Sequence, residues 1–208
     1  MQTHVTFVLD SSGSMSSIRE DTIGGFNTFL DEQHGEPGSA TVSLYNFDTN
    51  VDLVFDDYPI VEAPKLTEDN YRPGGRTALH DAISTAVTET ADLVRSKGQS
   101  ERPDNVIIVT LTDGKENASE TPHDRLREQV REYREEYDWE FLFIGANQEA
   151  ALTASSMGMD EDNSLDMAHS GEGAQAAYDS TSEQVSQVRR EGETHGFDEI
   201  DRNRQEDA

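Results

Sequence analysis

The sequence predicts an α/β fold in which helices cover both faces of a doubly wound, mostly parallel sheet with one antiparallel edge strand. Short apolar runs rich in β-branched residues alternate along the chain with longer segments of helical spacing. Two strand-like segments are joined by a turn of only three residues, which makes that pair antiparallel. Helices separate the other strand-like segments, and right-handed crossovers then determine most of the topology.

The N-terminal part of the chain contains the first strand, the first helix and the hairpin. Residues 4–10 (HVTFVLD) are an apolar run that ends in an acid, and residues 17–33 carry apolar side chains at roughly helical spacing. Apolar residues alternate over 40–47 as in a strand, and a second strand at 51–55 follows the short turn. We therefore predict an antiparallel hairpin here.

The middle of the chain contains its most apolar segment. A loop over 59–77, with three prolines and two glycines, leads into a predicted helix at 78–96. Residues 105–112 (NVIIVTLT) are the most continuous apolar run, which is typical of a central strand covered on both faces. A charged helix at 123–136 and a buried strand at 139–145 are predicted to follow.

The C-terminal part of the chain is more polar. We predict a short helix at 147–157, a last edge strand at 163–167 and a polar helix at 171–190. The remaining residues are charged and contain few apolar side chains, so we predict a frayed, disordered tail. The 208 residues then divide into one domain over 1–190 and a tail over 191–208.

The charge balance is strongly acidic. Asp and Glu total 43 against 16 Lys and Arg, and the formal net charge is −27. Phosphate would be repelled, so we expect no nucleic-acid partner. A surface made for a basic partner is one interpretation. We favour adaptation to concentrated salt, which screens self-repulsion, because the acids are spread along the chain and lysine is scarce. This interpretation predicts a halophilic archaeon as the source.

Several kinds of chemistry and location are disfavoured by the composition. The sequence has no cysteine, so a metal could be held only by oxygen or imidazole. Its first residues do not resemble a signal peptide, and no apolar stretch approaches the ~20 residues that span a bilayer. We therefore expect a cytoplasmic protein without a membrane partner.

Polar side chains lie beside three of the predicted elements, at one end of the sheet. Asp10, Ser12 and Ser14 come after the first strand. Asp113 follows the central strand, and Thr77 ends the long loop. Ligands of open α/β sheets gather at the C-terminal ends of the strands, so these loops should converge. Because hydroxyl and carboxylate oxygens suit hard cations, we predict a site for Mg²⁺, with Mn²⁺ or Ca²⁺ as alternatives.

Each of these residues also has a simpler interpretation. Ser12 or Ser14 could cap the helix at 17–33. Thr77 could cap the helix that follows it, and Asp113 could form an Asx-turn. Any one of them alone is more often a cap than a ligand, and their joint occurrence favours the metal.

Three motifs resemble those of the von Willebrand factor A domain family. Residues 10–15 (DSSGSM) are similar to that family's DxSxS signature. Residues 74–83 (GGRTALHDAI) resemble its threonine loop, and residues 111–114 (LTDG) resemble its third loop. The motifs occur in the family's order, and the resemblance covers about residues 1–190.

The resemblance implies a Rossmann-like fold and a metal ion-dependent adhesion site. By position, Ser12 and Ser14 would bind the metal directly, and Thr77 would bind it in the ligand-competent state. Asp10 and Asp113 would act mainly through water. A cation held by neutral hydroxyls stays electrophilic and, in this family, takes an Asp or Glu carboxylate from a partner. The resemblance therefore implies a non-enzymatic module for metal-dependent protein–protein interaction.

Other polar residues carry weaker signals. His80 lies near the predicted site, where packing or hydrogen bonding is its expected role. The remaining histidines show no ligand spacing; they are His4, His34, His123, His169 and His195. Asn147 could line the rim of the site, although a helix cap is favoured. Lys115, Glu116 and Asn117 could flank a partner or form a solvated loop.

Two other functions fit the sequence less well. A Mg²⁺-dependent phosphatase that uses Asp10 would need a second Asp two residues later, where Ser12 stands. A Ser14–His80–Asp113 triad lacks the Gly-x-Ser-x-Gly turn of α/β hydrolases. No glycine-rich phosphate loop follows a strand, which argues against nucleotide binding. A hydrolase is therefore kept as the alternative to an interaction module.

Overall fold

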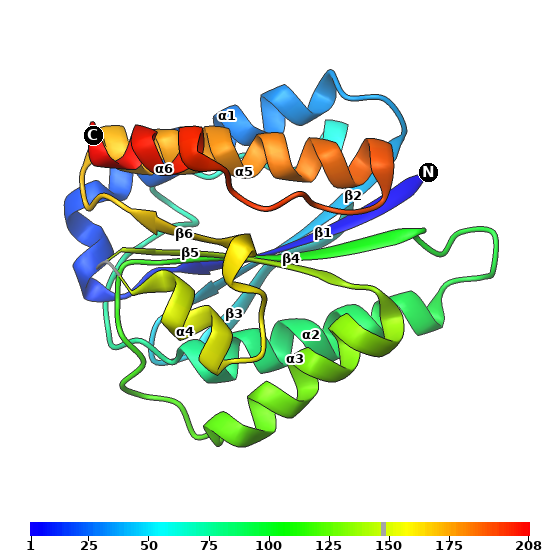
Figure 1. Ribbon diagram of the computed structural model, residues 1–208, viewed down its shortest axis with the longest axis horizontal. Helices are drawn as coiled ribbons and strands as arrows, with labels where there is room; N and C mark the ends of the chain where they lie inside the picture. Colours follow the sequence, from blue (N-terminus) through cyan, green and yellow to red (C-terminus); the bar gives the residue numbers. More distant parts are fainter. Residues whose placement is uncertain (147–148) are drawn as a thin grey trace.

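A six-stranded sheet lies at the centre of the protein, with helices on both of its faces (Figure 1). The structure is a computed structural model and describes residues 1–146 and 149–208. The strands are β1 (Gln2–Asp10), β2 (Ser39–Phe47), β3 (Val51–Pro59), β4 (Asn105–Thr112), β5 (Glu140–Ala146) and β6 (Ser164–Met167). They lie in the order β3-β2-β1-β4-β5-β6. β3, at one edge, is antiparallel to β2, whereas the other pairs are parallel, which confirms the predicted fold class.

The helices divide between the two faces of the sheet (Figure 1). The helical elements are η1 (Gly13–Ile18), α1 (Arg19–His34), η2 (Ile60–Glu62), α2 (Leu79–Ser96), α3 (His123–Tyr137), α4 (Ala150–Ser156), η3 (Glu161–Asn163), α5 (Gly171–Glu191) and α6 (Glu199–Glu206), where η marks a 3₁₀ helix. α1, α5 and α6 lie over one face, and α2, α3 and α4 lie over the other. Within the described part of the chain, no helix is both long and apolar enough to cross a bilayer.

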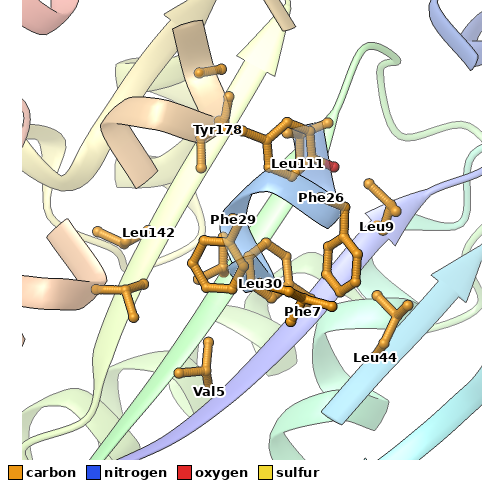
Figure 2. Packing of buried hydrophobic residues seen from close by; sticks show 14 of the residues in the cluster. Val5, Phe7, Leu9, Phe26, Phe29, Leu30, Leu44, Leu111, Leu142 and Tyr178 are labelled. Atoms are coloured by element: carbon orange, nitrogen blue, oxygen red, sulfur yellow. The ribbon is translucent and has the colours of Figure 1, made fainter. Parts of the chain in front are cut away.

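Two hydrophobic cores result from the alternation of side chains along the strands. Phe7 of β1 points toward α1, where its ring centroid lies 5.2 Å from that of Phe26 and 4.8 Å from that of Phe29 (Figure 2). The neighbouring Val8 points to the opposite face and joins the core under α2, α3 and α4. β1 is buried on both faces, and its C-terminal end lies in the middle of the sheet.

Helices α1 and α5 approach each other closely at Gly25. A Cβ atom on Gly25 would lie only 2.2 Å from Cδ2 of Tyr178. The Tyr178 ring therefore occupies the space that a side chain at residue 25 would need, and it is fully buried. This contact holds α5 against the helix that follows the first strand.

Several predicted boundaries differ from those observed. The helix predicted at 17–33 begins at Arg19, and the 3₁₀ helix η1 precedes it. β3 continues to Pro59, four residues beyond the predicted end, because a register shift against β2 accommodates Asp57 at φ 52°. The short helix predicted at 147–157 is α4, which covers Ala150–Ser156.

The predicted frayed tail is not observed. Asp198 caps α6, and its side chain accepts hydrogen bonds from the backbone N–H groups of Ile200 and Asp201. Phe197 and Gln205 are buried, whereas Ile200 is exposed. The prediction was wrong because the segment docks through a local cap and a few buried residues, which its low apolar content does not reveal.

Candidate functional site

The loops predicted to converge meet at the C-terminal ends of β1 and β4. These strands are neighbours in the sheet, and the connections from them lead to opposite sides, as at a ligand-binding switch point. The loop after β1 also pairs with the loop before α2, because Gly74 donates its N–H to Ser11 O (2.8 Å) and Gly13 donates to Gly75 O (3.3 Å). Backbone hydrogen bonds therefore hold two of the three predicted loops together.

Three of the predicted residues form a continuous chain of contacts. Ser12 Oγ lies 3.2 Å from Ser14 Oγ, and the Ser14 hydroxyl donates to Asp113 Oδ1 at 2.6 Å. Ser12 and Asp113 are buried, whereas Ser14 is exposed. The group is thus anchored in the protein and open to solvent at Ser14, as a binding site requires.

Asp10 lies beneath this group and is fully buried. Its Oδ1 accepts the N–H of Ser12 (2.6 Å), and its Oδ2 accepts the hydroxyl of Thr112 (2.5 Å). Burial raises the pKa of Asp10 to about 6, although the hydrogen bonds from Thr112 and Ser12 lower it and the nearby charge of Asp113 adds to the rise. A cation beside Asp10 would favour its charged form and oppose this shift.

Thr77 is held at the site by Asn117. Its N–H donates to Asn117 Oδ1 (3.0 Å), and its carbonyl accepts the N–H of Asn117 (3.0 Å). The Thr77 hydroxyl faces Gly114, where an added Cβ would lie 2.8 Å from Thr77 Oγ1 and 3.6 Å from Asp10 Oδ2. Glycine at 114 therefore leaves the space between Thr77 and Asp10 open.

The alternative interpretation of these residues as helix caps is not supported. Ser12 precedes η1, but its side chain makes no capping hydrogen bond. The N-cap residues of α1 and α2 are Ile18 and Ala78, so neither Ser14 nor Thr77 caps them. The bond from Ser12 N–H to Asp10 Oδ1 is of the Asx-turn kind.

One residue that touches this group was missed by the sequence analysis. His169 Nε2 lies 2.9 Å from Asp113 Oδ2, although 56 positions separate the two residues in the chain. No local spacing indicates this contact. The available signal is the position of His169 two residues after β6, at the same end of the sheet as the other loops.

The residues with weaker signals have mainly structural contacts. Glu116 accepts the backbone N–H groups of His80, Ala118 and Ser119, so it orders the loop instead of being solvated. The His80 ring lies 5.4 Å from that of His123, and burial lowers the pKa of His80. Exposed Lys115 pairs with Glu149.

Two further predictions concern the triad and the rim. Ser14 donates directly to Asp113, without the intervening histidine that a Ser14–His80–Asp113 triad requires. Asn147, considered for the rim of the site, lies outside the described residues. Among the described residues, no group of three or more His, Cys, Asp or Glu side chains is placed to hold a metal ion.

A cavity of about 230 Å³ lies next to the site. It shares Thr112 and Gly114 with the site, and Leu79, Phe143 and Met157 give it an apolar wall. A ligand bound near Gly114 would therefore have space for a neighbouring apolar group.

Comparison with known families identifies one match. The model of the von Willebrand factor type A domain matches residues 4–191. A comparison with curated proteins finds no relative.

Solved structures show the same fold. Proximal thread matrix protein 1 from the mussel byssus, in a structure with a zinc-occupied MIDAS motif, is 15% identical with a TM-score of 0.60, and the match covers 89% of this chain and 46% of that chain. A von Willebrand factor type A structure from Catenulispora acidiphila is 13% identical (TM-score 0.61; 89% and 43% covered). The pilus adhesin SpaC from Lactobacillus rhamnosus GG is 11% identical (TM-score 0.64; 89% and 30%). The chain thus spans less than half the length of each, and these likenesses show the fold alone.

Proposed function

This chain belongs to the von Willebrand factor type A domain family, and from that membership we propose that it binds protein partners through a divalent cation. The cation site would be a metal ion-dependent adhesion site, and the partner would supply an Asp or Glu carboxylate. The residues proposed to hold the metal, directly or through water, are Asp10, Ser12, Ser14, Thr77 and Asp113.

The contact chain Ser12–Ser14–Asp113 is the observation that carries the proposal. Around an octahedral ion with metal–oxygen distances of about 2.1 Å, neighbouring ligand oxygens lie about 3 Å apart. The two serine hydroxyls are 3.2 Å apart, and Ser14 Oγ lies 2.6 Å from Asp113 Oδ1. These spacings fit an ion of the size of Mg²⁺, and only a small separation of Ser14 from Asp113 would be needed.

The chemistry of the donor set supports binding to an acidic partner. Three of the five proposed ligands are neutral hydroxyls, and the Asp10 carboxylate is already engaged by Ser12 and Thr112. A cation held in this way keeps much of its positive charge and attracts another anionic oxygen. The solvent-exposed side at Ser14 is the side from which a partner's carboxylate could approach.

We propose Mg²⁺ as the resident ion, because hydroxyl oxygens and few carboxylates suit a small hard cation that keeps some of its waters. Mn²⁺ and Ca²⁺ are the alternatives, and zinc is added to the test because it occupies the motif in the similar mussel protein. We further propose a non-enzymatic role and a cytoplasmic location. The burial of Asp10, and the hydrogen bonds to both of its carboxylate oxygens, favour binding over the alternative, a Mg²⁺-dependent hydrolase that uses Asp10.

Calorimetric titration with Mg²⁺, Mn²⁺, Ca²⁺ and Zn²⁺ in concentrated KCl tests the metal site. We expect the wild-type protein to bind at least one of these ions at a single site, and Ser14→Ala to weaken that binding at least tenfold because a direct ligand is lost. Ser16→Ala is the matched control, since Ser16 is an exposed serine two residues away. Equal affinities for the wild type and Ser14→Ala would contradict the proposed ligand set.

An affinity pull-down in molar salt then tests the partner's chemistry. Proteins that are captured by the wild type, and lost with Ser14→Ala or after chelation of the metal, are the expected partners. Capture that persists in both cases would show that binding does not depend on the metal.

A further inference from the structure

The two carboxylate oxygens of Asp113 face different partners. Oδ1 accepts the hydroxyl of Ser14 at 2.6 Å, on the side of the proposed ligands. Oδ2 lies 2.9 Å from Nε2 of His169. The Asp113 side chain is 1% exposed and that of His169 is 42% exposed, so the histidine covers the carboxylate from the solvent side.

The connection that carries His169 is fixed on both sides. Ser170 caps α5 by accepting the N–H of Gly173 (2.9 Å), and a Cβ on Gly173 would lie 2.2 Å from Ala168 O. Gln205, from α6, accepts the N–H of Ala168 (2.9 Å) and donates to Gly173 O (3.2 Å). The backbone on either side of His169 is thus held by two helices, which gives the imidazole a defined position.

We propose that His169 is a positioning residue of the metal site. Its Nε2 lies 2.9 Å from Asp113 Oδ2 and holds the carboxylate so that Oδ1 faces the hydroxyls of Ser12 and Ser14. This inference rests on the proposed metal site. His169 lies outside the three motifs by which the chain resembles its family. Groups that contact a carboxylate at a metal site from outside the ligand set restrict its orientation, and losing such a contact typically weakens metal binding about 10- to 100-fold.

If His169 only stabilised the fold, removal of its imidazole would change metal affinity and stability in a different way. His169 is partly exposed, and pairs of this kind contribute little to folding stability. Removal of the imidazole should therefore lower metal affinity while leaving the melting temperature of the metal-free protein almost unchanged. A residue that only stabilises the fold would change both together.

The test compares His169→Ala with His169→Gln, and Mn²⁺ alone is the probe. We expect His169→Ala to weaken Mn²⁺ binding about 10- to 100-fold in calorimetry. His169→Gln should recover part of this loss, because its amide nitrogen can contact the Asp113 carboxylate at a similar reach. The matched control is His195→Ala, since His195 Nε2 forms a comparable contact with Glu191 (3.1 Å) beyond the far end of α5.

Several outcomes would overturn the inference. If the wild type binds Mn²⁺ and His169→Ala binds it equally well, His169 has no positioning role, although the proposed metal site stands. A fall in metal-free stability parallel to the loss of affinity would assign His169 to the fold. A nitrogen bound directly to Mn²⁺ in the electron spin echo spectrum would make His169 a ligand instead. If the wild type binds no divalent cation, both proposals fail.

Discussion

Burial acts in opposite directions on the pKa values of Asp10 and His4, two residues of β1. Each side chain is almost completely shielded from water, and each therefore disfavours its charged form. The pKa of the Asp10 carboxyl rises to about 6, and the pKa of the His4 imidazole falls to about 4. Asp10 lies at the end of β1 where the proposed cation would offset the cost of burying a charged carboxylate. His4 lies near the opposite end of β1, where its ring nitrogens contact the neutral hydroxyls of Thr41 and Thr6 instead of water.

His4 is held neutral in a polar cluster between the sheet and α2. Its Nδ1 lies 2.8 Å from Thr41 Oγ1, and its Nε2 lies 3.1 Å from Thr6 Oγ1. Negative charges on Asp57 and Asp56 raise the pKa of His4, while Lys97 lowers it, but desolvation is the largest effect. The imidazole therefore stays uncharged in the folded protein at pH values where it would be protonated in the unfolded chain.

This difference predicts a loss of stability with acid. Below an ordinary histidine pKa of about 6.5, the unfolded chain binds a proton at residue 4 that the folded protein does not bind. The contribution of His4 to the free energy of unfolding is therefore lost as the pH falls from about 6.5 to about 4. The full effect of this difference in pKa on the free energy of unfolding is about 3 kcal/mol. Asp10 has the opposite effect on stability below pH 6: its raised pKa means that the folded state binds a proton more readily than the unfolded chain, which favours folding as the pH falls.

A His4→Gln variant separates the two contributions. Wild type and variant share Asp10, so we expect the free energy of unfolding to fall less steeply between pH 7 and pH 4 in His4→Gln than in the wild type. Urea unfolding at a series of pH values in concentrated KCl measures this. Parallel curves for the two proteins would show that His4 does not titrate as its burial predicts.

At the scale of elements, α6 packs against the connection between β6 and α5 that carries His169. Its residue Gln205 bonds to both sides of the connection that carries His169, and its Asp201 is buried. The helix has only eight residues, and isolated helices of this length are not stable in water. Its formation therefore depends on the cap at Asp198 and on packing against α5 and β6.

We expect Asp198→Ala to destabilise α6. Asp198 takes part in a reciprocal capping box with Asp201, and losing a helix N-cap costs about 1 kcal/mol. Hydrogen exchange of the amides in α6 should become faster, with little change in β1 or β4. Asn203→Ala is the control, because Asn203 is an exposed residue within the same helix. Unchanged exchange in Asp198→Ala would mean that packing alone holds the helix.

At the scale of the whole molecule, the net charge of −27 opposes the compact state. Few basic residues offset the acids, and several of the ion pairs that they form are exposed, such as Lys65–Asp31 and Arg72–Asp69. Exposed pairs of this kind contribute little to stability. Screening by salt is therefore the main way in which the repulsion can be reduced, since the Debye length falls to about 3 Å at 1 M.

This repulsion predicts a salt requirement for folding. On transfer from molar KCl into dilute buffer, we expect the protein to lose helical circular dichroism, and to regain it when the salt is restored. Equimolar choline chloride should act like KCl if screening is the cause. A protein that keeps its full helical signal and its melting temperature in dilute buffer would contradict adaptation to salt.

The fold and the residues of the proposed site could be read largely from local patterns. The periods of strand and helix are local properties, and they indicate the hairpin, the central strand 105–112 and the loops that contain Ser14, Thr77 and Asp113. Because parallel strands end at a common edge, the convergence of these loops followed from the order of the elements. The division into a domain over 1–190 and a separate C-terminal segment stays a prediction.

The contact between His169 and Asp113 and the docking of α6 could not be read in this way. Both join segments that are distant in the chain, and each depends on a few polar contacts whose partners carry no periodic signal. The continuation of β3 to Pro59 likewise depends on the left-handed backbone at Asp57, which only pairing with β2 reveals. Local periodicity specifies which segments form strands and helices, whereas long-range packing determines which polar side chains meet.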